Sequence, residues 1–219
     1  MATPHPRLMS IEGIDGSGKS TQVAAVAAAL DTAGVPAAPA VVKAYGARSV
    51  NTLAEELTGD RFAYHPLIPA ELREWVFACD VAYYTRVEFT PLLDAGTTLV
   101  WDRGPLSYRV SAAAYGGLTE WVEKAQSLYP RPRVTYLLDL PAETAVARLR
   151  SRATKPQQAD ESLVLLRQIR DRLLAAARDR PDVVVLDATL PAEDLTDRIV
   201  EHWRATAEQR PAVAPARPG

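Results

Sequence analysis

Short apolar segments recur along the chain, and polar or glycine-containing stretches separate them. Each segment is brief and rich in Val, Leu, Thr or Ala, a pattern that predicts β-strands. The segments lie at residues 7–13, 37–46, 97–104, 133–140 and 182–189. The chain is therefore expected to contain five strands.

Between these strands, apolar residues recur every three or four positions, as they do on one face of an α-helix. Pro69 and Pro141 mark helix starts, and Gly34 and Gly96 mark helix ends. Helices are therefore expected at residues 19–34, 53–57, 69–96, 141–152, 161–180 and 191–207, with a turn-broken helical region at 106–128.

This alternation of strands and helices predicts an α/β fold, a five-stranded parallel sheet with helices on both faces. Residues 1–208 are expected to form a single domain. Its polar segment at about 150–160 lacks apolar anchors and is predicted to be a lid. Residues 209–219 are rich in Pro and Ala and are predicted to be an extended or disordered tail.

The first predicted strand ends in the sequence GIDGSGKS, from Gly13 to Ser20. This matches G-x-x-x-x-G-K-[S/T], the phosphate-binding loop of P-loop proteins, and it lies between a strand and a helix as that loop requires. The loop predicts ATP as a ligand. Its glycines let backbone N–H groups turn toward an anion, and the following helix points its positive end at the same place. The residues expected to bind ATP here are Gly13, Asp15, Gly16, Ser17, Gly18, Lys19, Ser20 and Thr21.

Two residues of the loop carry the chemistry. Lys19 is expected to reach the β- and γ-phosphates, and the Ser20 hydroxyl is expected to bind Mg²⁺. Asp102 and Arg103 end the third predicted strand. An acidic residue in that position can hold Mg²⁺ or its water, and the neighbouring guanidinium can bind a phosphate. A plain ion pair at the end of a strand is the alternative.

Four cations follow within eight residues of one another at the end of the helix at 141–152 and in the lid: Arg148, Arg150, Arg152 and Lys155. Cations at a helix C-terminus are favourable in any protein. Cations on a lid would also stabilise the charge that develops during phosphoryl transfer. We predict the second role and leave open which of the four performs it.

Composition excludes several other classes of protein. The net charge is -2 and no basic stripe occurs, which argues against binding of nucleic acid. No apolar run is long enough to cross a membrane or to serve as a signal peptide. The single cysteine, Cys79, suits a reducing compartment, so a cytoplasmic location is expected. The Asn-Lys-x-Asp stretch of guanine-specific switches is also missing.

These segments, in this order and spacing, resemble the thymidylate kinases over about residues 9–199. The resemblance implies a P-loop fold of the nucleoside monophosphate kinase type, ATP and Mg²⁺ as cofactors, and a homodimer formed through the long helices. It also implies that Asp15 contacts the acceptor sugar, Phe77 stacks on the base, Arg103 binds the acceptor phosphate and Arg148 lies against adenine. Together with the loop and the lid, it predicts these catalytic residues: Lys19, Asp15, Arg103, Arg150 and Arg152.

Parts of the acceptor side depart from the family pattern. Val81 stands where the family has an arginine that reads the thymine edge, and valine cannot donate a hydrogen bond. dTMP is therefore predicted to be a poor or unselective substrate, and Val81→Arg is predicted to raise kcat/KM for dTMP. The alternative is that another donor, such as Arg86, Arg109 or a tyrosine hydroxyl, takes the place of the arginine. Tyr45 and Tyr115 occupy altered stretches and are expected to contact the acceptor. The predicted activity is transfer of the ATP γ-phosphoryl to dTMP or a related monophosphate. Transfer to a nucleoside or another hydroxyl-bearing metabolite is the alternative.

Overall fold

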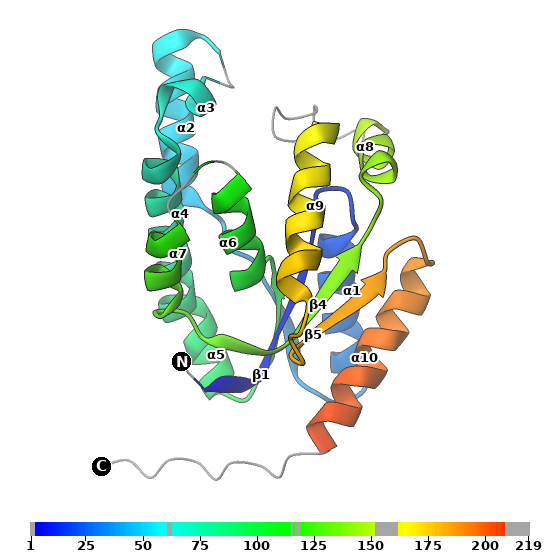
Figure 1. Ribbon diagram of the computed structural model, residues 1–219. Helices are drawn as coiled ribbons and strands as arrows, with labels where there is room; N and C mark the ends of the chain where they lie inside the picture. The colour runs from blue at the N-terminus through cyan, green and yellow to red at the C-terminus, as the bar shows by residue number, and fades with distance from the viewer. Residues whose placement is uncertain (1–2, 61–62, 115, 117–118, 152–161, 209–219) are drawn as a thin grey trace, which may run out of the picture.

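The structure, a computed structural model, describes residues 3–60, 63–114, 116, 119–151 and 162–208 (Figure 1). Within these residues, five strands form one parallel sheet in the order β2-β3-β1-β4-β5. The strands are β1 (Pro4–Gly13), β2 (Ala37–Ala40), β3 (Thr98–Asp102), β4 (Arg131–Asp139) and β5 (Val183–Asp187). The predicted fold class is therefore confirmed.

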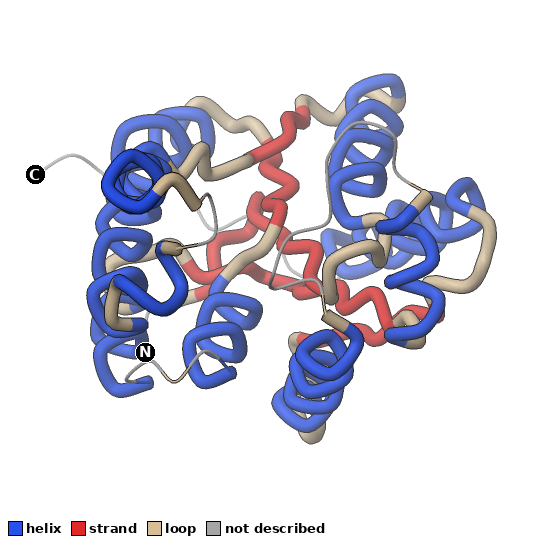
Figure 2. Tube along the Cα trace, turned by 90° about the horizontal axis from the view of Figure 1, so that it is seen from above, coloured by secondary structure: helices blue, strands red, loops and turns tan. Residues whose placement is uncertain are grey.

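Helices cover both faces of this sheet, as the view from above shows (Figure 2). Helices α1 (Lys19–Thr32) and α10 (Ala192–Glu208) pack against each other, and α1 lies on β2 and β3. Helices α6 (Pro105–Ala114) and α9 (Leu163–Ala177) pack against each other in front of the strands (Figure 1). The remaining helices are α2 (Tyr45–Thr58), α3 (Tyr64–Leu67), α4 (Ala70–Tyr84), α5 (Thr90–Asp94), α7 (Thr119–Gln126) and α8 (Ala142–Arg150).

Strand β1 lies at the centre of the sheet, between β3 and β4. Its residues Leu8, Met9 and Ile11 are 0% exposed, because both of its faces are covered by helices. The phosphate-loop sequence follows β1 directly. Since all neighbouring strands run parallel, the loop and the residues that follow β3 meet at the same edge of the sheet.

The long helix predicted at 69–96 is present, but a π-helical turn, η1 (Thr85–Phe89), interrupts it between α4 and α5. The Thr85 hydroxyl donates to the carbonyl of Val81 at 2.9 Å and so competes with the regular ladder. Pro91 lacks the N–H that would continue that ladder. Both effects favour the wider turn.

Helix α2 differs from its prediction. A short helix was expected at 53–57, and a strand was expected to run to residue 46, but α2 begins at Tyr45. The Asp80 carboxylate, on α4, accepts hydrogen bonds from the backbone N–H groups of Gly46 at 2.9 Å and Ala47 at 3.0 Å. This cap comes from a distant part of the chain, so a local sequence pattern could not reveal it.

Val81 also differs from its prediction. The family resemblance implies that position 81 lies against the acceptor base, but the Val81 side chain is 0% exposed and belongs to a core cluster with Leu99, Trp101 and Tyr108. Val81 is not among the described residues that line the cavity at the ends of β1, β2 and β3. Its side chain therefore serves packing between α4 and the sheet.

None of the helices in the described part of the chain has both the length and the apolar character needed to cross a membrane.

Val81→Arg is expected to destabilise the protein, because the guanidinium would enter this core and the free energy of unfolding would fall by about 3 kcal/mol or more. Val81→Ala, the matched control, removes only methyl groups and should cost about 2 kcal/mol. Urea unfolding monitored by circular dichroism measures both. If Val81→Arg were as stable as the unsubstituted protein, the side chain at 81 would reach the cavity, as the sequence analysis expected.

Candidate functional site

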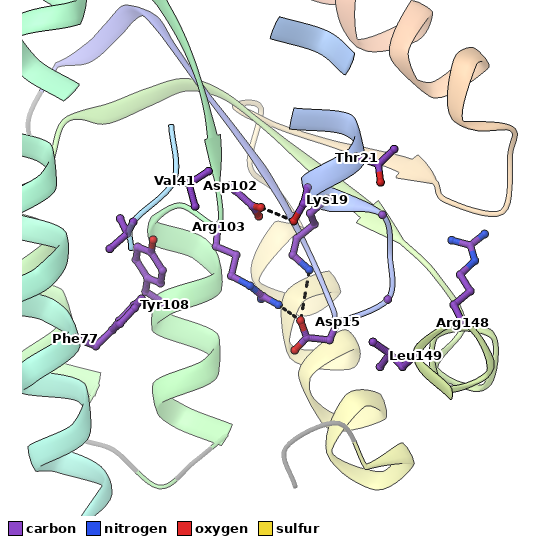
Figure 3. A pocket seen from close by; sticks show the side chains of 14 residues that line it. Asp15, Lys19, Thr21, Val41, Phe77, Asp102, Arg103, Tyr108, Arg148 and Leu149 are labelled. Atoms are coloured by element: carbon purple, nitrogen blue, oxygen red, sulfur yellow. Dashed lines mark hydrogen bonds and ion pairs between the residues drawn. The ribbon is translucent and has the colours of Figure 1, made fainter. Parts of the chain in front are cut away.

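A cavity of about 520 Å³ opens where β1, β2 and β3 end (Figure 3). It is bounded by the phosphate loop, the start of α1, the residues after β2 and β3, and the end of α8. The residues that line it are Asp15, Gly16, Gly18, Lys19, Ser20, Thr21, Val41, Val42, Phe77, Asp102, Arg103, Tyr108, Arg148 and Leu149.

The phosphate loop is held in its turn by a glycine and a close contact. Gly16 has φ +82°, in the left-handed region that favours glycine. A Cβ at position 16 would also lie 2.7 Å from the carbonyl oxygen of Ala145, on α8. The loop therefore packs directly on α8, which carries Arg148 and Leu149 to the rim of the same cavity.

Lys19 is a nearly buried cation, 6% exposed, at the centre of this arrangement. Its Nζ donates to the carbonyl oxygen of Ile14 at 2.8 Å and lies 3.9 Å from Oδ1 of Asp15. Burial, followed by repulsion from Arg103, lowers the pKa of Lys19 to about 8, although the nearby carboxylates oppose that change. An anionic phosphate bound beside Lys19 would restore its charge.

Arg103 and Asp15 connect the two sides of the cavity. Nη2 of Arg103 donates to Oδ1 of Asp15, which joins the turn after β3 to the phosphate loop (Figure 3). Arg103 has φ +62°, an uncommon conformation for a residue with a Cβ, and its backbone N–H donates to the carbonyl of Ile11 at 3.1 Å. The guanidinium is thereby directed into the cavity.

Ser20 and Asp102 form a second contact between the same two strand ends. The Ser20 hydroxyl donates to Oδ2 of Asp102 at 2.6 Å. The Ser20 hydroxyl and the Asp102 carboxylate therefore lie side by side at the wall of the cavity.

The wall opposite the phosphate loop is largely apolar. The rings of Phe77 and Tyr108 meet edge to face with their centroids 5.0 Å apart, and Val41 and Val42 complete the wall. Burial, with the nearby Glu12, raises the pKa of Tyr108 well above its ordinary value, so the hydroxyl stays protonated. This wall offers an aromatic surface with one hydroxyl group.

The structure brings most of the predicted site residues to the cavity. These are Asp15, Gly16, Gly18, Lys19, Ser20, Thr21, Phe77, Asp102, Arg103 and Arg148. Gly13 and Ser17 belong to the loop but are buried, and they are not among the described residues that line the cavity. Nη2 of Arg148 donates to the carbonyl of Ala188 at 3.2 Å, beside the end of β5.

Other predicted residues lie elsewhere. Tyr45 is 59% exposed and its ring faces Tyr84, so the structure does not bring it to the cavity. Arg150 is exposed at the end of α8 and is not among the described residues of the cavity wall. Arg152 and Lys155 of the lid, and Tyr115, lie outside the described residues.

Sequence reasoning missed four residues of the cavity wall, namely Val41, Val42, Tyr108 and Leu149. For the two valines a signal was available, because they follow β2 directly and carboxyl strand ends bind ligands. Tyr108 lies five positions after Arg103, in the region 106–128 for which the sequence predicts only turn-broken helix. Its ring contact with Phe77 joins α6 to α4, and a local sequence pattern does not reveal such a contact.

Comparison with known proteins agrees with this geometry. A family model described as "Thymidylate kinase" matches residues 11–199. A "Probable thymidylate kinase" of Methanoculleus marisnigri is 33% identical over 91% of this chain and 95% of its own length. A "Thymidylate kinase" of Xanthomonas euvesicatoria is 31% identical over 88% of this chain and 80% of its own length. A "Probable thymidylate kinase" of Pyrococcus abyssi is 29% identical over 87% of this chain and 92% of its own length.

The lowered pKa of Lys19 predicts how phosphoryl transfer depends on pH. Lys19 is cationic below about pH 8 and neutral above it. Since kcat/KM reports the free enzyme, kcat/KM for ATP should fall about tenfold per pH unit above that value. Triphosphate bound beside Lys19 should raise the pKa of Lys19, so kcat should stay constant to a higher pH than kcat/KM does.

Steady-state rates between pH 6 and 10 test this, with circular dichroism as the control for unfolding. Any residual activity of Lys19→Arg should lack the alkaline decline, because a guanidinium does not titrate there. A constant kcat/KM up to pH 9.5 in the unsubstituted protein would show that Lys19 is not the titrating group.

Proposed function

This chain belongs to the thymidylate kinase family, and we propose that it transfers the γ-phosphoryl group of ATP to a nucleoside monophosphate, with dTMP as the leading acceptor. One observation carries the proposal. A single cavity holds the phosphate loop with Lys19 on one side and Arg103 with the aromatic wall on the other. Such a cavity can hold two phosphate-bearing ligands facing each other.

The donor half consists of the phosphate loop, Lys19 and Ser20. The loop N–H groups and the start of α1 bind the phosphates of ATP, and the Lys19 ammonium stabilises the charge that develops on the transferred group. Gly13 and Ser17 act through the backbone, because both are buried and the N–H of Ser17 donates to the carbonyl of Ile14 within the turn. Arg148 lies at the rim near the end of β5, where it is available to stack on adenine.

The acceptor half consists of Arg103, Asp15 and the aromatic wall. Arg103 binds the acceptor phosphate and orients one of its oxygens for in-line attack. Asp15 holds the guanidinium and faces the acceptor sugar. Phe77 provides the surface on which the base lies.

The carboxylates that line the cavity are already held in ion pairs or hydrogen bonds, and this favours a phosphate acceptor over a hydroxyl acceptor. A hydroxyl must give up its proton, commonly to a carboxylate, whereas a monophosphate is already anionic at neutral pH. Among the described residues that line the cavity, the carboxylates are Asp15 and Asp102. Asp15 is bound by Arg103 and Lys19, and Asp102 accepts from Ser20. Neither is poised as a base.

The Ser20 and Asp102 oxygens fit Mg²⁺, which prefers oxygen ligands and keeps several waters. The described residues contain no cluster of three or more His, Cys, Asp or Glu side chains that would form an all-protein metal site. A site with one or two protein ligands is therefore the arrangement that this chain offers. When bound, Mg²⁺ neutralises phosphate charge.

Further features of the proposal rest mainly on the sequence. Arg150 and Arg152 are proposed to act from a lid once substrates are bound. The homodimer is proposed to form along α4 and η1, where Leu72, Tyr83 and Val87 are at least 50% exposed. The domain limits, the contact of Tyr115 with the acceptor and the cytoplasmic location stay predictions.

A panel of acceptors tests the proposed function. dTMP, dUMP, dCMP and dGMP should all be compared with thymidine in an ATP-consumption assay. We expect dTMP to be phosphorylated and thymidine to be used with a kcat/KM at least about a hundredfold lower, because Arg103 contributes only when a phosphate is present. Lys19→Ala is the control for contaminating kinases and should be inactive.

The same panel tests base selectivity. The wall around Phe77 offers few hydrogen-bonding groups, so the preference for dTMP over the other monophosphates should stay below about a hundredfold. A larger preference would mean that a polar group reads the thymine edge. Equal use of thymidine and dTMP would overturn the assignment of a monophosphate kinase.

A further inference from the structure

Glu12 is a charged residue in an unusual place. It lies in β1, one position before the phosphate loop, and its side chain is 0% exposed. Burying a carboxylate is unfavourable unless hydrogen bonds compensate for lost water. Glu12 does not line the cavity, so it is not available to touch a substrate there.

The hydrogen bonds that the structure describes for the Glu12 carboxylate all go to residues 103–107, which comprise the turn after β3 and the first residues of α6. Oε1 accepts from the backbone N–H of Gly104 at 3.0 Å. Oε2 accepts from the backbone N–H of Ser107 at 3.2 Å and from the Ser107 hydroxyl. One carboxylate thus holds both the turn before α6, at Gly104, and the first turn of α6, at Ser107.

This turn lies tightly against β1. A Cβ at position 104 would be 2.8 Å from the Cβ of Ser10 and 3.0 Å from Oε1 of Glu12. The preceding N–H, that of Arg103, is bound by the carbonyl of Ile11. Two consecutive N–H groups, at 103 and 104, are therefore fixed by β1, and they hold Arg103 in its left-handed conformation.

The conformation of Arg103 decides where its guanidinium points. A left-handed conformation is strained for a residue with a Cβ, so it persists only when neighbouring contacts impose it. Tyr108 follows Ser107 directly, so the same carboxylate also sets the aromatic wall. Burial raises the pKa of Glu12, while its hydrogen bonds to Ser107 and the charge of Arg103 oppose that rise.

The phosphate loop is held by other contacts. The backbone N–H of Ser17 and the Nζ of Lys19 both donate to the carbonyl of Ile14. Neither contact involves the Glu12 side chain. The charge of Glu12 favours the protonated form of Lys19 from a distance. Well below the Lys19 pKa of about 8, loss of the Glu12 carboxylate should therefore disturb the acceptor half of the cavity and leave the contacts of the ATP half in place.

We propose that Glu12 is a positioning residue for the acceptor, whose buried carboxylate fixes the turn at 103–107 so that Arg103 meets the acceptor phosphate. The inference rests on the proposed function. Glu12 is thereby assigned to the acceptor side of the cavity, although in sequence it is adjacent to the loop that binds ATP.

Glu12→Gln tests this, because glutamine has nearly the shape of glutamate but only one side-chain oxygen. It can therefore accept from only some of the three donors, which are the N–H of Gly104 and the N–H and hydroxyl of Ser107. The KM for dTMP should rise about tenfold or more, with the KM for ATP within about threefold of that of the unsubstituted enzyme. Ser107→Ala removes one donor and leaves the charge in place, so it should shift the KM for dTMP in the same direction by a smaller factor. This milder variant keeps the test available if Glu12→Gln does not fold.

Thr135→Val is the matched control. Thr135 is 5% exposed and its hydroxyl pairs with that of Ser10 at 3.0 Å, so the variant also removes a buried polar contact of β1. It should lower the melting temperature and leave both KM values unchanged. The comparison separates positioning from a general loss of stability.

Two results would overturn the inference while the unsubstituted enzyme phosphorylates dTMP. An equal rise in both KM values would assign Glu12 to the phosphate loop. A lower melting temperature with both KM values unchanged would make its role structural only. An unsubstituted enzyme that phosphorylates no monophosphate would overturn the proposed function and this inference together.

Discussion

The contact between Arg103 and Asp15 is the interaction on which the site depends. It joins the turn after β3 to the phosphate loop after β1, and so connects the proposed acceptor side to the proposed donor side. The sheet order makes this possible, since β1 and β3 are parallel neighbours whose carboxyl ends lie together. Without that order, the two residues, 88 positions apart, would not meet.

Charge balance explains why this edge of the sheet suits phosphate ligands. Lys19 and Arg103 converge on Asp15, and burial, followed by repulsion from Arg103, lowers the pKa of Lys19 despite the nearby carboxylates. Bound phosphate groups would supply further negative charge. Glu12 holds the same turn from inside the sheet, where its carboxylate contacts backbone N–H groups instead of ligands.

Local features were predictable from the sequence, and features set by distant contacts were not. The phosphate loop and the Asp102-Arg103 pair follow from spacing at strand ends, and they do line one cavity. The start of α2 depends on Asp80, the burial of Val81 depends on packing of α4, and Tyr108 reaches Phe77 through α6. None of these contacts leaves a periodic signal. Glu12 did leave a different kind of signal, an acidic residue in the buried half of a strand.

A double-mutant cycle on Asp15 and Arg103 measures directly whether their contact links the two halves of the site. The variants Asp15→Asn, Arg103→Gln and the double variant are compared by kcat/KM for dTMP at saturating ATP. If the two side chains act as a unit, the double variant should lose less activity than the product of the single losses, by about tenfold or more. Losses that simply multiply would contradict the account, because Arg103 and Asp15 would then act independently.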